Sequence, residues 1–185
     1  ASQDLLHALK RQHFAQDLTD PAAYGLAMMY CDNRTSVIDD DQAVQYLQQA
    51  INSKHLLQVS KDKTAIRLAW MRKEKRTTAI TDDQAVQYLR QAINSKHLAQ
   101  ASIDDATLKL AMMCYIKRAP VITDDQAGLY FQDSIKSQHL PQASIDDATL
   151  KLAGMCCDSR TAVITDDQAV QYLGDALNSQ HLPQV

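Results

Sequence analysis

The chain has 185 residues, a net charge of −3 and 45% hydrophobic residues, which is typical of a protein that buries apolar faces and excludes general disorder. It contains only four glycines and four prolines, which favours long helices over a fold with many turns. No stretch of about 18 apolar residues occurs, so we expect no membrane span. Residues 1–14 lack the apolar core of a signal peptide.

One motif recurs at a constant interval along the chain. Copies of ITDDQAVQYL begin 42 residues apart, at Ile38, Ile80, Ile122 and Ile164. A period of this length is the signature of a repeat array, in which each unit contacts only its neighbours. The period divides the sequence into a half unit at 1–18 and units at 19–60, 61–102, 103–144 and 145–185. We therefore expect one continuous array over residues 1–185.

The first half of each unit has a helical pattern. In the first unit Asp20 is expected to cap the helix and Pro21 to fill its first position, where the missing N–H costs no hydrogen bond. Aspartate recurs at this position as Asp62, Asp104 and Asp146. An apolar stripe with helical spacing follows, and its members are Leu26, Ala27 and Met29; Leu68, Ala69 and Met71; Leu110, Ala111 and Met113; Leu152, Ala153 and Met155. These residues are expected to be buried.

The second half of each unit predicts another amphipathic helix. Thr81, Thr123 and Thr165 each stand three residues before a glutamine, the Thr-x-x-Gln capping box that begins a helix. Ala43, Tyr46, Leu47 and Ala50 recur in the later units with the spacing of one helix face. The pattern fades at the INSKHL segment, and no strand pattern occurs. The sequence thus predicts an all-α solenoid of antiparallel helix pairs.

With the unit laid out, the chain resembles the Sel-one-like repeat family, which is related to tetratricopeptide repeats. The matching residues in the first unit are Ala22, Leu26, Ala27, Tyr30, Ala43, Tyr46, Leu47 and Ala50, and the match extends through all four units. The sequence departs from the family in lacking its Gly-x-Gly loop, replaced here by residues 33–37, and in a longer link after the second helix. The resemblance implies a right-handed superhelix that acts as a scaffold or adaptor, with a concave surface for protein partners and no catalytic residues.

Histidine and cysteine also repeat along the chain. The histidines His13, His55, His97, His139 and His181 are equivalent, and they are expected to have a structural role near the end of the second helix. A metal ladder is the less favoured alternative, because neighbouring helices lie roughly 10 Å apart. The cysteines Cys31, Cys114, Cys156 and Cys157 lack zinc-type spacing and are expected to be buried in a reducing compartment. We expect a cytoplasmic protein; a bacterial protein delivered into a host cell is the alternative.

Arginine repeats in the loop between the two helices of a unit, at Arg34, Arg76, Arg118 and Arg160. A bridge to a nearby helix-capping aspartate or a loop carbonyl is the favoured interpretation, and an anion site in each unit is the alternative. Residues 39–41 are acidic but lack the spacing of a calcium loop, so helix capping accounts for them. No nucleophile elbow, phosphate loop or metalloprotease motif occurs, so we expect no enzyme activity and no cofactor.

The second unit differs from the others in charge. Residues 61–102 hold nine Lys or Arg against four Asp or Glu, a net charge of +5, whereas the other segments are neutral or acidic. Lys63, Arg67, Trp70 and Glu74 are spaced to share one helix face, and Trp70 is the only tryptophan. The predicted binding residues are Lys63, Arg67, Trp70, Lys73, Lys109, Met112 and Lys151. A solvated charged face, with Trp70 filling a gap between units, is the alternative.

Three functions remain open from the sequence. The first is a non-catalytic scaffold that binds a peptide or protein of acidic character on its concave face. The second is nucleic-acid or anionic-lipid binding through the basic unit, which the acidic units beside it disfavour. The third is a regulatory or targeting array attached to a larger enzyme. Apolar residues of the last helix, Tyr172, Leu173, Ala176 and Leu177, also predict self-association or contact with a flanking domain.

Overall fold

The computed structural model describes residues 2–10, 16–116 and 121–178. This part of the chain is all-helical, with no strand. It divides into two compact units, residues 1–98 and 99–185, which are described separately below.

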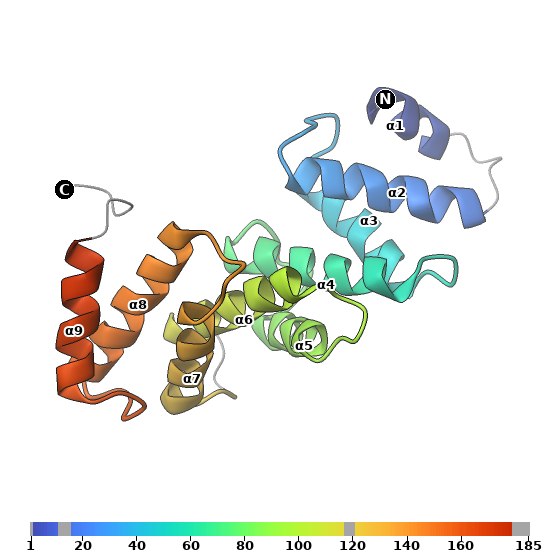
Figure 1. The fold of residues 1–185 in the computed structure, drawn as a ribbon. Coiled ribbons are helices and arrows are strands. Elements are labelled where there is room, and N and C mark those ends of the chain that lie inside the picture. The colour runs from blue at the N-terminus through green and yellow to red at the C-terminus, as the bar shows by residue number, and fades with distance from the viewer. Residues whose placement is uncertain (1, 11–15, 117–120, 179–185) are drawn as a thin grey trace. The chain divides into compact units, whose positions relative to one another are not determined.

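Each unit is built from helices that pack on their neighbours in sequence (Figure 1). The first unit contains α1 (Ser2–Lys10), α2 (Gln16–Cys31), α3 (Asp40–Asn52), α4 (Gln58–Lys73) and α5 (Asp82–Ile93). The second unit contains α6 (Gln100–Tyr115), α7 (Asp124–Ile135), α8 (Gln142–Cys157) and α9 (Asp166–Leu177). Beyond the consecutive pairs, α2 also contacts α4, so these two first helices of successive repeats are neighbours. The predicted pairing of helices within each repeat is therefore confirmed.

The predicted start of the first helices is wrong. These helices begin about a turn earlier, at Gln16, Gln58, Gln100 and Gln142. Asp20 is consequently the fifth residue of α2, and Pro21 lies inside the helix rather than at its first position. The residues before α4, α6 and α8 make no side-chain cap bond. The aspartate accepts hydrogen bonds from side chains instead of capping the helix: Asp20 accepts from Gln49, and Asp62 accepts from Gln58 and Ser95.

The second helices begin as the sequence predicts. Thr81, Thr123 and Thr165 each accept a hydrogen bond from the backbone N–H of the glutamine three residues on, and the glutamine side chain accepts from the threonine N–H. Asp39 forms the same capping box at α3. Both ends of the box satisfy N–H groups that a helix start would otherwise leave without a partner.

The core follows the predicted stripe. The leucines Leu26, Leu68, Leu110 and Leu152 are fully buried, as are most of their Ala and Met companions. Met29 is the exception, because it is only half-buried. Cys31, Cys114 and Cys156 are buried as expected, whereas Cys157, at the end of α8, is exposed, so that part of the cysteine prediction is wrong.

Candidate functional site

A left-handed turn ends three of the first helices, α2, α4 and α8, and precedes the loop arginine. Asn33, Lys75 and Ser159 have φ of 56°, 59° and 54°. The next residue, as in Arg76, donates its backbone N–H to the carbonyl five residues earlier, and the left-handed residue donates to the carbonyl three earlier. This is the Schellman arrangement, which closes a helix and turns the chain sharply. The backbone at the arginine is therefore held in the same way at these three helix ends.

Two of these arginines join one repeat to the preceding one. The Arg76 guanidinium donates to Asp40 Oδ1 at 2.9 Å, and Arg160 donates to Asp124 Oδ1 at 2.8 Å. The bond to Asp40 raises the pKa of Arg76. The interpretation favoured from the sequence is a bridge to a nearby cap aspartate or loop carbonyl; for these two arginines the partner is the aspartate directly after the cap residue of α3 or α7. Arg34 is exposed, and Arg118 lies outside the described residues.

The guanidinium groups of Arg76 and Arg160 also lie over aromatic rings. The Arg76 guanidinium lies 5.2 Å from the Tyr30 ring and 5.0 Å from the Trp70 ring, and Arg160 lies 5.3 Å from the Tyr115 ring. A guanidinium over an aromatic face is attracted by the ring quadrupole. The Trp70 ring, which is half-buried, is thus held on α4 by the arginine of its own repeat.

Two of the predicted binding residues on α4, Arg67 and Lys73, already form ion pairs within the chain. Arg67 forms an ion pair with Asp32 at 2.6 Å, and Lys73 pairs with Glu74 at 2.6 Å. Both pairs are substantially exposed, so each contributes roughly 0–1 kcal/mol to stability. Arg67 and Lys73 therefore offer a ligand less unopposed charge than the sequence suggested.

Three lysines of the same segment have no carboxylate partner in the described part of the chain. Lys63 and Lys75 are exposed and Lys61 is half-buried. The four other cations of residues 61–76 are all paired with carboxylates: Arg67 with Asp32, Arg72 with Asp82, Lys73 with Glu74 and Arg76 with Asp40. The charge available to a partner on α4 is consequently carried by Lys61, Lys63 and Lys75.

The predicted residues of the second unit are also engaged locally. Lys109 pairs with Asp105 and Lys151 with Asp147, each one helical turn away. The Lys151 ammonium additionally lies 5.6 Å from the Tyr115 ring. Met112 is half-buried on α6. Neither lysine is a free cation, which leaves the α4 lysines as the stronger part of the predicted surface.

Sequence reasoning missed that the repeated aspartate of the first helix is buried in three repeats, as Asp20, Asp62 and Asp146, and partly buried in the other, as Asp104. Asp62 is only 2% exposed, and its carboxylate accepts hydrogen bonds from the Gln58 amide and from the Ser95 hydroxyl. In the third repeat Asp104 accepts from Gln100 at 2.7 Å and from Ser137 at 2.5 Å. The recurrence of Gln-x-x-x-Asp with a distant Ser-x-His is the signal that could have revealed it.

The serine of this cluster also orders the turn that carries the repeated histidine. Ser53, Ser95 and Ser137 each accept the backbone N–H of the histidine two residues on, at 2.9 to 3.1 Å. The His139 ring lies 3.2 Å from Asp104 Oδ2, whereas the side chains of His55 and His97 are exposed. His13 and His181 lie outside the described residues. Because the serine donates to aspartate rather than to histidine, the set lacks the proton path of a nucleophilic triad.

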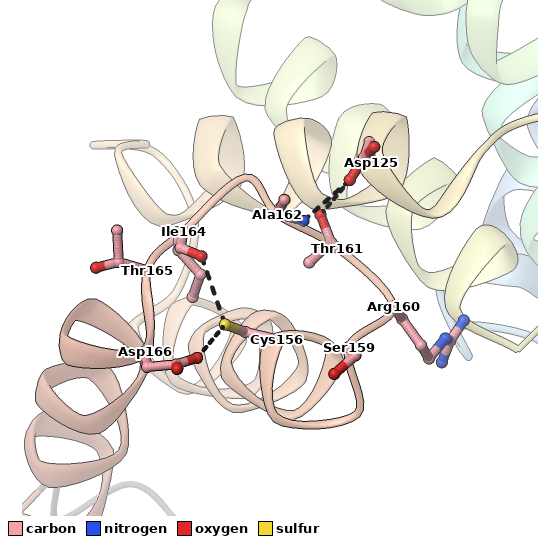
Figure 2. A pocket seen from close by; sticks show the side chains of 9 residues that line it. All are labelled: Asp125, Cys156, Ser159, Arg160, Thr161, Ala162, Ile164, Thr165 and Asp166. Atoms are coloured by element: carbon pink, nitrogen blue, oxygen red, sulfur yellow. Dashed lines mark hydrogen bonds between the residues drawn. The ribbon is translucent and has the colours of Figure 1, made fainter.

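A hollow in the second unit lies beside the loop between α8 and α9 (Figure 2). It is open and has a volume of about 600 Å³. Asp125 accepts hydrogen bonds from the Thr161 hydroxyl and the Ala162 N–H across it. Burial and the neighbouring Asp166 raise the pKa of the Cys156 thiol, which keeps it protonated and weakly nucleophilic. The hydrogen bonds to Asp125 hold the loop between α8 and α9 against α7 at the edge of this hollow.

Within residues 2–10, 16–116 and 121–178, no group of three or more His, Cys, Asp or Glu side chains could hold a metal ion. No helix in the same part of the chain is long and apolar enough to cross a bilayer. The chain matches no protein-family model, and searches of curated proteins and of solved structures found no match.

Proposed function

We propose that the chain is a non-catalytic protein-interaction module that binds an acidic peptide or protein surface on α4. The proposal takes the helix pairs as parts of one right-handed array, with the first helices lining its binding face. The observation that carries it is that Lys61, Lys63 and Lys75 have no carboxylate partner in the described part of the chain, and that Lys63 shares a face of α4 with the half-buried Trp70. Aromatic anchors with flanking charge are typical of binding hot spots.

The contacts around Trp70 support a recognition role over a purely structural one. Arg76 is tied to Asp40 and covers Trp70, so the indole is held in place before a ligand arrives. Preorganisation lowers the entropic cost of binding, and the unpaired lysines would speed the encounter with an acidic partner. Lys109, Met112 and Lys151 belong to the same proposal as secondary contacts.

The proposal is tested by selection from an unbiased library of displayed 12-residue peptides. The native protein is expected to enrich peptides rich in Asp and Glu with one or two apolar residues. The triple variant Lys61→Glu, Lys63→Glu, Lys75→Glu is expected to lose that enrichment. The matched control, Lys54→Glu, Lys96→Glu, Lys136→Glu, changes charge equally at exposed lysines outside α4 and should retain it.

Equal enrichment by all three proteins would contradict the proposal. Single-stranded DNA and phosphatidylserine vesicles are included as separate ligands. If they bind the native protein more tightly than any selected peptide, with steep loss in salt, binding of a polyanion replaces the protein-interaction function.

A further inference from the structure

Arg67 takes its carboxylate partner from a different helix, unlike its counterparts in the second unit. The residue one helical turn before Arg67 is Lys63, so α4 offers no acid at that position. Arg67 pairs instead with Asp32, the residue directly after α2, at 2.6 Å. In α6 and α8 the equivalent cation pairs one turn away on its own helix, Lys109 with Asp105 and Lys151 with Asp147.

The contact between Arg67 and Asp32 is weakly held. Their side chains are 33% and 37% exposed, and water and salt weaken an exposed ion pair. One guanidinium nitrogen, Nη2, makes the bond, whereas the planar fork of an arginine can hold both oxygens of a carboxylate in two parallel bonds. Asp32 also lies at the C-terminal end of α2, where the helix dipole disfavours a negative charge. A ligand carboxylate that reached two guanidinium nitrogens would therefore be a stronger partner for Arg67 than Asp32 is.

Arg67 shares its face of α4 with residues of the proposed binding surface. The spacing places it between Lys63 and Trp70 on that face. Lys63 is exposed and has no carboxylate partner in the described part of the chain, and Trp70 is half-buried. With Asp32 in place, the face offers a ligand one unpaired cation beside the indole. Displacement of Asp32 would give the ligand a second cation on the same face.

We propose that Asp32 is an intramolecular competitor for the acidic ligand of α4, which occupies Arg67 until a carboxylate of the ligand displaces it. The inference rests on the proposed function and names Arg67 as the residue that receives the ligand's carboxylate. A ligand must give Arg67 a better bond than Asp32 does, and it must approach against the negative charge of Asp32. Asp32 thus selects strongly acidic partners over weakly acidic ones.

The test measures fluorescence anisotropy of a labelled peptide of six glutamates around one leucine, with the full chain at low ionic strength. Asp32→Asn is expected to bind this peptide about two- to fivefold more tightly than the native protein, the range that loss of an exposed ion pair allows. Arg67→Gln is expected to bind it severalfold more weakly. Circular dichroism should show both variants to be as helical as the native chain.

Asp158→Asn is the matched control for the change in charge. Asp158 occupies the equivalent position at the end of α8, is exposed and forms no ion pair in the described part of the chain. Its substitution should leave the affinity within about twofold of the native value. A double-mutant cycle separates pairing from general charge: in the Arg67→Gln background, Asp32→Asn should have little effect, because the residue for which Asp32 competes is gone.

The proposal is overturned if Asp32→Asn binds the peptide no more tightly than the native protein, or if it tightens binding equally with and without Arg67. Acidic peptides enriched from the displayed library would still support the proposed function in both cases, so the two failures are distinguishable. Absence of binding to both native and Asp32→Asn proteins at about 1 mM also overturns the inference. The library selection then decides the proposed function independently.

Discussion

Three residues, Asn33, Lys75 and Ser159, hold a backbone conformation that most side chains avoid. Their positive φ closes α2, α4 and α8, and the arginines that follow Lys75 and Ser159 bond to an aspartate of the preceding repeat. Left-handed backbone costs a residue with a Cβ roughly 1 kcal/mol relative to glycine, and asparagine tolerates it best. The backbone at Lys75 and Ser159 is therefore locally strained, and the hydrogen bonds of the turn offset that strain.

Ser159→Gly is expected to raise the free energy of unfolding by about 0.5–1 kcal/mol, because glycine removes that strain. The neighbouring Asp158→Gly is the control, since Asp158 has φ of −80° and gains nothing from glycine. Urea unfolding followed by circular dichroism measures both. A stability gain from Asp158→Gly as large as that from Ser159→Gly would contradict the strain at Ser159.

Asp104, a partly buried carboxylate, responds to pH through its hydrogen bonds. Burial opposes its ionisation, but hydrogen bonds from Ser137, Gln100 and His139 outweigh that effect and lower its pKa. A carboxylate with a lowered folded pKa stabilises the fold above its unfolded pKa, and that contribution is lost as the pH falls through the folded value. Ser137 and Gln100 thus stabilise the charged form of Asp104.

The stability of the native protein should therefore fall below about pH 4 more steeply than that of the Asp104→Asn variant. Asp133→Asn removes an equal charge at an exposed position of α7 and should follow the native profile. Urea unfolding at a series of pH values between about 2 and 7 gives the three curves. Identical slopes for native and Asp104→Asn would show that the Asp104 hydrogen bonds do not favour its ionised form.

At the scale of elements, the α7 helix depends on a glycine that its counterparts replace with valine. A Cβ at Gly128 would meet the Thr161 hydroxyl at 2.9 Å and the Val163 side chain at 3.2 Å. The Thr161 hydroxyl is itself bonded to Asp125, so it cannot move aside without losing that bond. The absence of a side chain at Gly128 therefore leaves the space that Thr161 and Val163 of the loop occupy.

Gly128→Ala is expected to lower the free energy of unfolding by about 1 kcal/mol or more, since overpacking exceeds the gain in helix propensity. Gly154→Ala on α8 is the matched control, because open space surrounds its Cβ position. That substitution should stabilise by about 0.5–1 kcal/mol. Thermal unfolding distinguishes the two, and a stabilising Gly128→Ala would show that the loop yields.

At the scale of the whole chain, the 42-residue period predicts the helix pairs and their buried leucines, because burial imposes a regular pattern on residues close in sequence. The threonine capping boxes are equally local and are confirmed. The aspartate cap of the first helices is wrong because Asp62 bonds to Ser95, 33 residues away. Local rules cannot anticipate such a partner.

The predicted binding surface shows the same limit. The sequence identifies Lys63, Arg67 and Trp70 as one line on α4, but it does not show that Asp32 neutralises Arg67.

The most direct test of the binding function uses the single tryptophan. In a ¹⁵N-labelled protein the Trp70 indole N–H gives one resonance, which can be followed as an acidic peptide recovered from the library is added. The account predicts that this resonance and the backbone amides of α4 shift with the same dissociation constant, and that the Lys61→Glu, Lys63→Glu, Lys75→Glu protein shows no such shift. Peptide-dependent shifts confined to other helices, with the Trp70 resonance unmoved, would contradict binding on α4.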